Sequence, residues 1–261
     1  MISKTYGTVT LIHGDCMDYM TYLNDNDFDL ALVDPPYGIN APNMTMGSNP
    51  NRSGNDKNGN LQYGGTSVAQ KLKKGRLNGG SGKLKDRNLN TMNCDWDYVK
   101  PTPEYFKELF RISNNQIIWG GNYFDLPPTR GFAIWNKNQP WDNFSQAEFA
   151  WTSFDCPAKL FTFSNRGGAN EEIKIHPTQK PVDLYEWILK SYAKQGNTIL
   201  DTHAGSFSNA IACLEMGFTG TFIEIDDQYF KDGCERVQAK YEAITLGFSK
   251  TKLSKSHPIL F

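Results

Sequence analysis

An acid, two prolines and a tyrosine, Asp34-Pro35-Pro36-Tyr37, give the strongest chemical signal in this 261-residue sequence. They follow the aliphatic residues 30–33, which are typical of a buried strand, and open α/β sheets bind ligands at the carboxyl ends of such strands. Because proline lacks a backbone N–H, the Asp34 carboxylate and the local carbonyl groups remain acceptors with few competing donors. The ring of Tyr37 adds a flat surface for stacking. These residue types suit a planar amine, although a stiffened turn after a strand would have the same sequence.

A second set of polar and small residues follows the expected strand 198–200. It reads Asp201-Thr202-His203-Ala204-Gly205-Ser206 and leads into an expected helix that ends at Met216, where Gly217 stops it. The free N–H groups at the start of a helix can bind polar ligand groups, and an acid at a strand end can accept hydrogen bonds. The next expected strand likewise ends at an acid, Glu224. An ordinary strand-to-helix turn is the alternative interpretation of this segment.

The elements that must position these groups alternate between strand and helix. Short aliphatic runs predict strands, and apolar residues three and four apart predict helices. The expected strands cover residues 9–12, 30–33, 116–119, 132–135, 147–151, 159–163, 198–200 and 221–223. The expected helices cover residues 103–112 and 181–192, the segment ending at Met216, and residues 230–244, with Pro181 as a first helical residue. Such alternation predicts a single α/β domain over residues 1–261, with a mostly parallel twisted sheet and helices on both faces.

Together these motifs resemble those of the amino-methyltransferases that use S-adenosylmethionine. The family's amine motif, Asp/Asn/Ser-Pro-Pro-Tyr/Phe, is matched by the tetrapeptide at Asp34, and its cofactor motif, Asp-Pro-Phe-x-Gly-Ser-Gly, is matched in part by Asp201, Gly205 and Ser206. Further matches are Gly14-Asp15, His176-Pro177-Thr178-Gln179-Lys180-Pro181 and Glu224. The order, with the catalytic motif first and the cofactor motif last, is similar to that of the β class of DNA amino-methyltransferases. It implies a Rossmann-like methyltransferase fold.

The resemblance implies a role for each matched residue. Asp15 would bind the adenine amino group of the cofactor, Lys180 its carboxylate region and Glu224 its ribose hydroxyls. The implied cofactor-binding residues are Asp15, Asp34, Lys180, Asp201, His203, Gly205, Ser206 and Glu224, and the implied catalytic residues are Asp34, Pro35, Pro36 and Tyr37. The chain departs from the family pattern where Thr202-His203 replaces Pro-Phe and where Phe207 replaces the third glycine.

The implied reaction is methyl transfer to the N6 amine of adenine in DNA, because Asp34 resembles the adenine-N6 branch more than the cytosine-N4 branch. An amine in a duplex is buried in the base stack, so the target base would have to be flipped out and stacked on Tyr37. Methylation at cytosine C5 is disfavoured, since it needs a cysteine nucleophile, normally in a Pro-Cys motif, and this chain has Cys156-Pro157 in the opposite order.

The net charge of −1 conceals a basic segment. Residues 52–87 hold nine basic and two acidic residues, a charge of +7, which leaves −8 for the rest of the chain. They belong to a Gly- and Asn-rich insert at residues 40–95, which we expect to be flexible and to contact DNA phosphates, with a solvated loop as the alternative. Residues 156–175 are a candidate target-recognition region. The expected DNA-binding residues are Lys71, Lys73, Lys74 and Arg76, with Asn122 and Tyr123 at the base pocket.

Composition excludes several classes of protein. The chain has 34 aromatic residues, so most of it is expected to fold, and its five cysteines and four histidines lack the spacing of a metal site. No apolar run approaches the roughly 20 residues that span a bilayer, and no signal peptide is evident, so we expect a cytoplasmic protein without a membrane partner. The alternatives are a cytosine-N4 methyltransferase, an RNA or protein-amide methyltransferase, and a catalytically silent nucleic-acid-binding protein. The expected partner is double-stranded DNA, while a homodimer and a cognate restriction endonuclease remain open.

Overall fold

One mixed sheet forms the centre of the protein. The computed structural model describes residues 1–39, 97–138, 145–164 and 174–247, and within them nine strands follow the order β1-β2-β9-β8-β3-β4-β6-β5-β7. The strands are β1 (Ile2–Tyr6), β2 (Val9–His13), β3 (Phe28–Val33), β4 (Ser113–Trp119), β5 (Phe132–Asn136), β6 (Ala147–Thr152), β7 (Lys159–Thr162), β8 (Thr198–Asp201) and β9 (Thr219–Glu224). Five of their eight pairings are parallel, which confirms the mostly parallel sheet.

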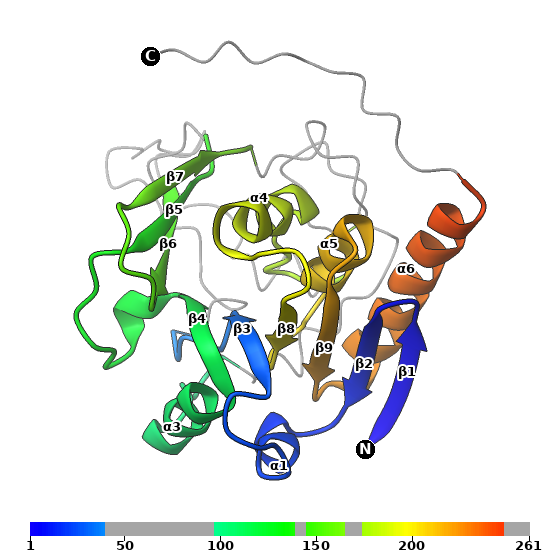
Figure 1. Ribbon diagram of the computed structural model, residues 1–261, viewed down its shortest axis with the longest axis horizontal. Helices are drawn as coiled ribbons and strands as arrows, with labels where there is room; N and C mark the ends of the chain where they lie inside the picture. The colour runs from blue at the N-terminus through cyan, green and yellow to red at the C-terminus, as the bar shows by residue number, and fades with distance from the viewer. Residues whose placement is uncertain (40–96, 139–144, 165–173, 248–261) are drawn as a thin grey trace, which may run out of the picture.

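Helices cover both faces of this sheet. Figure 1 shows α4 (Val182–Tyr192), α5 (Ser208–Met216) and α6 (Asp227–Thr245) on one side, with α1 (Cys16–Met20) and α3 (Pro103–Ile112) on the other. Two hydrophobic cores lie between these helices and the sheet. Leu184 and Ile188 on the apolar face of α4 belong to the first core, and Leu109 and Ile112 on the apolar face of α3 belong to the second, on the other side of the sheet. Apolar residues at helical spacing produce these faces, as the sequence predicts.

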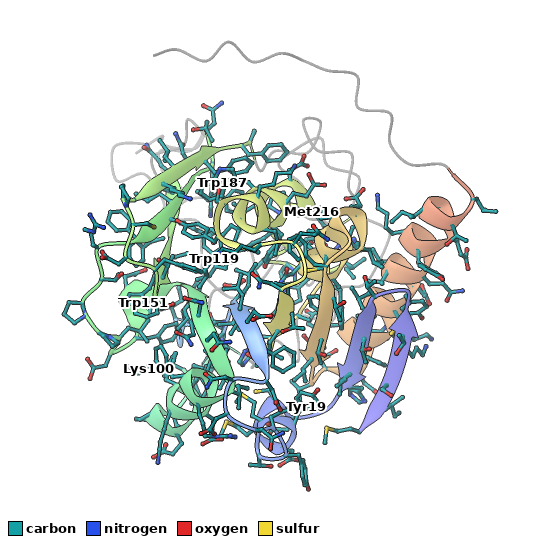
Figure 2. The ribbon with its side chains drawn as sticks, viewed as in Figure 1. Tyr19, Lys100, Trp119, Trp151, Trp187 and Met216 are labelled. Carbon is teal, nitrogen blue, oxygen red and sulfur yellow. The ribbon has the colours of Figure 1, made fainter. Side chains whose placement is uncertain are left out.

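The large aromatic side chains divide between the two cores. Trp119 belongs to the core beneath α4, whereas Trp151 belongs to the core beneath α3, and Figure 2 shows both beside the central strands. Successive residues of a strand point to opposite faces, so β4, which is buried over residues 116–119, contributes Ile117 to the first core and Ile118 to the second. None of the described helices is long and apolar enough to cross a membrane.

Three local features differ from the sequence prediction. The edge strand β1 and the short helix α1 were not expected, because β1 is largely exposed and α1 has only five residues. Neither element has the regular spacing of apolar residues from which a strand or a helix is predicted. Pro181 is the residue before α4 rather than its first helical residue, since its ψ of 146° is extended.

Candidate active site

Acidic side chains gather at one edge of the sheet, at the carboxyl ends of neighbouring parallel strands. β9 ends at Glu224, β8 ends at Asp201, and β3 is followed directly by Asp34. Asp15 follows β2, which pairs with the other side of β9. Because ligands of open α/β sheets bind at this edge, these residues form a row of hydrogen-bond acceptors where a ligand is expected.

Asp34 is held at both of its carboxylate oxygens. The hydroxyl group of Tyr37 donates to Oδ1 at 2.6 Å, and the ammonium group of Lys180 donates to Oδ2 at 2.5 Å. The backbone is fixed as well, because Oδ1 of Asp97 accepts the N–H groups of Tyr37 at 2.6 Å and Gly38 at 3.0 Å. A carboxylate oxygen has two lone pairs, so the orientation of Asp34 is set while acceptor capacity remains for a substrate donor.

The ring of Tyr37 is packed closely by the segment that follows β4. It stacks on Tyr123 with ring centroids 4.9 Å apart and meets Phe124 edge-on at 6.2 Å. Gly120 has a φ of +67°, and a Cβ at this position would lie 2.1 Å from Cε1 of Tyr37. Of the two residues expected at the base pocket, the structure brings Tyr123 against Tyr37, while Asn122 is exposed.

Lys180 is a charged side chain that is only 4% exposed. Besides Asp34, it forms an ion pair with Oε2 of Glu148 at 3.1 Å, and Oε1 of Glu148 pairs with Lys137 at 2.5 Å. Burial acts to lower the pKa of Lys180, but Asp34 and Glu148 outweigh it, so the pKa is raised. The resemblance assigns Lys180 to the cofactor carboxylate, whereas in the structure its ammonium group contacts these two protein carboxylates.

Asp201 and Glu224 are buried carboxyl groups. Asp201 accepts the N–H of His203 and the side-chain amide of Asn209, each at 3.1 Å. Glu224 accepts the N–H of Gly205 at 2.7 Å and so ties the end of β9 to the turn before α5. Burial raises the pKa of both carboxyl groups to about 7. Both therefore change charge near neutral pH.

Phe207, which replaces the family's third glycine, keeps a backbone conformation that favours glycine. Its φ is +59°, which costs about 1–2 kcal/mol for a residue with a side chain. Its ring is fully buried against Gly233 of α6, and burying such a side chain contributes about 1.5–3 kcal/mol. The burial offsets the strain, so Gly205 and Ser206 still form the turn that opens α5.

Thr202 and His203, the other departure, form a polar cluster with α3. The hydroxyl oxygens of Thr202 and Tyr105 lie 2.7 Å apart, and Oγ1 of Thr202 lies 2.9 Å from Nδ1 of His203. Burial lowers the pKa of His203 to about 4, so this ring is neutral at neutral pH. The cluster fixes the loop after β8 without adding a charge to the site.

Asp15 is exposed and begins α1. Its Oδ1 accepts the N–H of Met17 at 2.7 Å, which is the usual role of an acid at a helix start. Within the part of the chain that the structure describes, its second carboxylate oxygen accepts no hydrogen bond. Asp15 lies at the same edge of the sheet as Glu224, because the N–H of the preceding residue, Gly14, donates to the Glu224 carbonyl at 3.0 Å.

Comparison with known proteins decides the family. The model of a family described as DNA methylase, N6_N4_Mtase, matches residues 96–235. The chain belongs to this DNA methylase family. Its members transfer methyl groups from S-adenosylmethionine, and the matched residues include Asp97, Lys180, Asp201 and Glu224.

Individual relatives resemble the methylase over different shares of its length. The type II methyltransferase M2.MboI of Moraxella bovis is 26% identical over 240 residues, which cover 83% of each chain. The type II methyltransferase M.HpaI of Haemophilus parainfluenzae is 31% identical over 85 residues, covering 33% of this chain and 27% of the relative. Among solved structures, the cytosine-N4-specific PvuII DNA methyltransferase has a TM-score of 0.52 with 12% identity, and the match covers 93% of this chain and 94% of that one. This last similarity supports the fold.

The residues at the carboxyl edge fit the family's cofactor. S-adenosylmethionine carries an ammonium group, two ribose hydroxyls and an adenine amino group, all of which are hydrogen-bond donors. The methylase offers buried acceptors at Glu224 and Asp201 and an exposed acceptor at Asp15, at the carboxyl ends of three adjacent strands. Asp34 follows the next strand, β3, so a donor on the substrate amine would meet its acceptor directly beside a cofactor held by these residues.

The affinity of the methylase for S-adenosylmethionine is expected to fall below about pH 7. Burial raises the pKa of Asp201 and Glu224 to about 7, so lowering the pH protonates both groups, and a neutral carboxyl is the weaker acceptor. The dissociation constant should rise by up to about tenfold per pH unit for each carboxyl group that must ionise. Calorimetric titration at several pH values measures this, with Asp201→Asn and Glu224→Gln each expected to flatten the profile. A dissociation constant independent of pH would contradict the expectation that Asp201 and Glu224 bind the cofactor as carboxylates.

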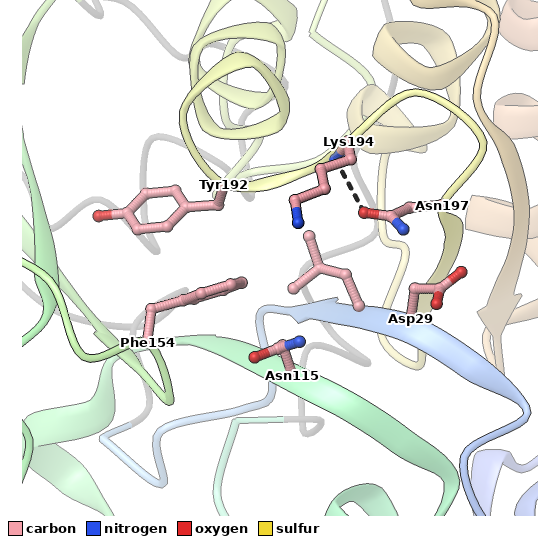
Figure 3. Close-up of a pocket in the computed structure, with 7 residues that line it drawn as sticks. Asp29, Asn115, Phe154, Tyr192, Lys194 and Asn197 are labelled. Carbon is pink, nitrogen blue, oxygen red and sulfur yellow. Dashed lines mark hydrogen bonds between the residues drawn. The ribbon is translucent and has the colours of Figure 1, made fainter.

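A separate pocket lies at the opposite edge of the sheet. Figure 3 shows its lining by Asp29, Leu30, Asn115, Phe154, Tyr192, Lys194 and Asn197. Asp29 is near the start of β3, and Asn197 precedes β8, whereas Asp34 and Asp201 stand at the other ends of these strands. This pocket is therefore distinct from the row of acids.

Several expected DNA contacts lie outside the described residues. These are Lys71, Lys73, Lys74 and Arg76 with the whole insert 40–95, and residues 165–173 of the expected recognition region 156–175. Conversely, the structure adds residues that the sequence analysis did not single out for the site. Asp97 holds the tetrapeptide backbone, Gly120 contacts Tyr37, and Glu148 with Lys137 extends the ion pair of Lys180.

Proposed function

We propose that the methylase transfers a methyl group from S-adenosylmethionine to the N6 amine of adenine in double-stranded DNA, at a specific sequence and with the base flipped out. The observation that carries this proposal is Asp34. Its carboxylate is oriented at both oxygens, stands beside the acceptors Asp201 and Glu224, and adjoins the ring of Tyr37. Similarity to type II methyltransferases supports a role in restriction-modification, with a restriction endonuclease as the proposed partner.

The chain's own residues account for the alignment of the amine. Bound S-adenosylmethionine supplies an already activated methyl group, so the protein has mainly to orient the nucleophile and exclude water. Asp34 and the carbonyl of Pro35 would accept the two amine hydrogens, which favours a tetrahedral nitrogen with its lone pair free to attack. The prolines leave no N–H to compete for these acceptors. The methyl group gained by the nitrogen would leave a neutral thioether on the cofactor, and the surplus amine proton would pass to Asp34, which already accepts it, and from there to solvent.

The choice of adenine rests on the acid at position 34. Asp34 is similar to the residue of the adenine-N6 branch, and its two held oxygens present an anionic acceptor to the amine. Extrusion of the base from the duplex would cost roughly a few kcal/mol, which stacking on Tyr37 would offset.

Mapping modified bases tests this proposal. The gene should be expressed in a host that lacks DNA methylation, and its genomic DNA sequenced by a method that reads N6-methyladenine and N4-methylcytosine directly. Adenine methylation at one short sequence is the expected result. Methylation of cytosine N4 would replace adenine as the target, and unmodified DNA with unimpaired S-adenosylmethionine binding would reject DNA as the substrate.

Tyr37 should contribute through both its ring and its hydroxyl group. Tyr37→Phe removes the hydrogen bond to Asp34, and we expect a loss of about 1 kcal/mol, or roughly fivefold in kcat. Tyr37→Ala also removes the stacking surface, which should weaken capture of the flipped base by a further 1 to 3 kcal/mol or so. Single-turnover rates and DNA titrations measure the two effects. Equal losses in both variants would show that stacking contributes nothing.

The insert 40–95 is proposed to contact DNA phosphates. Replacing Lys71, Lys73, Lys74 and Arg76 by alanine should weaken DNA binding and reduce the slope of log affinity against log salt by roughly 0.9 per lost contact. S-adenosylmethionine binding should be unchanged, which serves as the control. An unaltered salt slope would assign DNA binding to other residues, such as the region 156–175.

A further inference from the structure

Four side chains of alternating charge connect the outer half of the sheet to the catalytic tetrapeptide. Lys137 follows β5, Glu148 lies in β6, Lys180 precedes α4, and Asp34 follows β3. The successive ion-pair distances are 2.5, 3.1 and 2.5 Å. We call these four residues the charge chain. It ends on the carboxylate that the proposed function assigns to the substrate amine.

We propose that Glu148 is a positioning residue for methyl transfer, which holds the ammonium group of Lys180 in place and thereby fixes the carboxylate of Asp34. This inference rests on the proposed function, because it concerns the same site. Glu148 itself would not touch the substrate.

The geometry shows why Lys180 needs a second anion. An ammonium group has three donors. Lys180 donates to Oδ2 of Asp34 at 2.5 Å and to the hydroxyl oxygen of Tyr37 at 3.5 Å, and its ion pair with Oε2 of Glu148 at 3.1 Å supplies the second anion. With Asp34 as the only anion, the ammonium group could move across the carboxylate and occupy the lone pairs intended for the substrate amine. Glu148 opposes this movement because its own backbone is held within the sheet, where it pairs with Trp135 of β5.

Burial makes the arrangement sensitive to the loss of one charge. Lys180 is 4% exposed, and an ion buried to this extent is stable only when its partners compensate for lost hydration. Two cations and two anions make the charge chain neutral as a whole. Converting Glu148 to an amide leaves Asp34 as the remaining carboxylate partner of Lys180 in the chain.

We expect the alkaline side of the pH profile of kcat to follow the protonation of Lys180. The titratable groups that face its ammonium are Asp34, Tyr37, Glu148 and His176. Burial and Lys180 lower the pKa of His176 to about 3, so that ring does not titrate at alkaline pH. Burial and Asp34 hold the pKa of Tyr37 well above its ordinary value. Loss of Glu148 should therefore let Lys180 lose its proton at lower pH and release Asp34.

Two measurements on the full-length protein test the inference. In Glu148→Gln, we expect kcat for DNA methylation to fall by up to about a hundredfold, with KM for S-adenosylmethionine little changed. The descending alkaline limb of kcat should move to lower pH by about one unit or more. The NMR shift of the Lys180 Cε carbon, assigned with Lys180→Arg, should titrate at correspondingly lower pH in the variant without DNA or cofactor.

Matched variants separate positioning from a general loss of structure. Glu215→Gln removes another partly buried carboxylate that pairs with a lysine, Lys240, at 2.6 Å and remote from the site, so both readouts should stay at wild-type values. Glu148→Asp keeps the charge and should restore much of the rate and the position of the alkaline limb. Two results would overturn the inference. In the first, Glu148→Gln keeps both the alkaline limb of kcat and the pH of the Lys180 titration at the wild-type position. In the second, Glu148→Asp and Glu148→Gln lose the same share of kcat and have the same alkaline limb. A wild-type protein that methylates no DNA would instead reject the proposed function, and the Lys180 titration would still decide whether Glu148 controls Lys180.

Discussion

Replacement of Asp34 by alanine is expected to abolish methyl transfer while leaving the affinity for S-adenosylmethionine within about tenfold. The carboxylate is the proposed acceptor for the substrate amine, and the two described side chains that hold it, Tyr37 and Lys180, both present donors to this position. Removing an oriented group that acts in the transition state costs about 10²–10³-fold, and loss of substrate orientation adds to this. We therefore expect kcat to fall by at least about a thousandfold.

A matched variant distinguishes the role of the charge from that of the acceptor. Asp34→Asn keeps one acceptor oxygen but gives up the ion pair with Lys180, so its rate should lie between those of the wild-type and alanine proteins. Single-turnover kinetics with saturating cofactor measure the rate of the chemical step, and a parallel titration measures cofactor affinity. Turnover by Asp34→Ala within about tenfold of the wild-type rate would contradict the assignment of this residue.

The sequence predicts the tetrapeptide at Asp34 and the segment that begins at Asp201 as parts of the site, because each of them comes after a short aliphatic run typical of a strand. Asp34 and Asp201 stand directly at strand ends, and parallel pairing of β3 with β8 brings them to the same edge of the sheet. The family resemblance also predicts Glu224 at the end of β9. Phe207, a departure from the family motif, has a left-handed backbone, which glycine adopts at the least steric cost.

The contacts that tune the tetrapeptide could not be predicted in this way, because they join residues far apart in the chain. Lys180 is 146 residues from Asp34, and Asp97 is 60 residues from Tyr37. Strand order is equally decisive for Glu148: β6, rather than the preceding β5, pairs with β4 and so brings this acid to Lys180. An isolated acid in a strand with mixed burial carries no local signal of such a role.

Substitution of Gly120 by alanine tests how closely Tyr37 must be held. Gly120 has a φ of +67°, and its new Cβ would lie 2.1 Å from Cε1 of Tyr37, so the ring must move. A displaced ring would lose its hydrogen bond to Asp34 and its stacking on Tyr123, and a shift of about 1 Å at a reacting group can cost a hundredfold in rate.

The control for Gly120→Ala is a glycine with the same backbone constraint but free space around it. Gly196 has a φ of +93°, and nothing lies within 4 Å of the Cβ that alanine would add. Gly196→Ala should therefore cost only the conformational strain, about 1–2 kcal/mol in the free energy of unfolding, and leave kcat unchanged. For Gly120→Ala we expect a fall in kcat of about a hundredfold, with cofactor affinity retained because Asp201 and Glu224 are not displaced. If both variants kept the wild-type kcat, the ring of Tyr37 would not need the position that the structure gives it, and stacking on this ring would have to be assigned to another aromatic side chain.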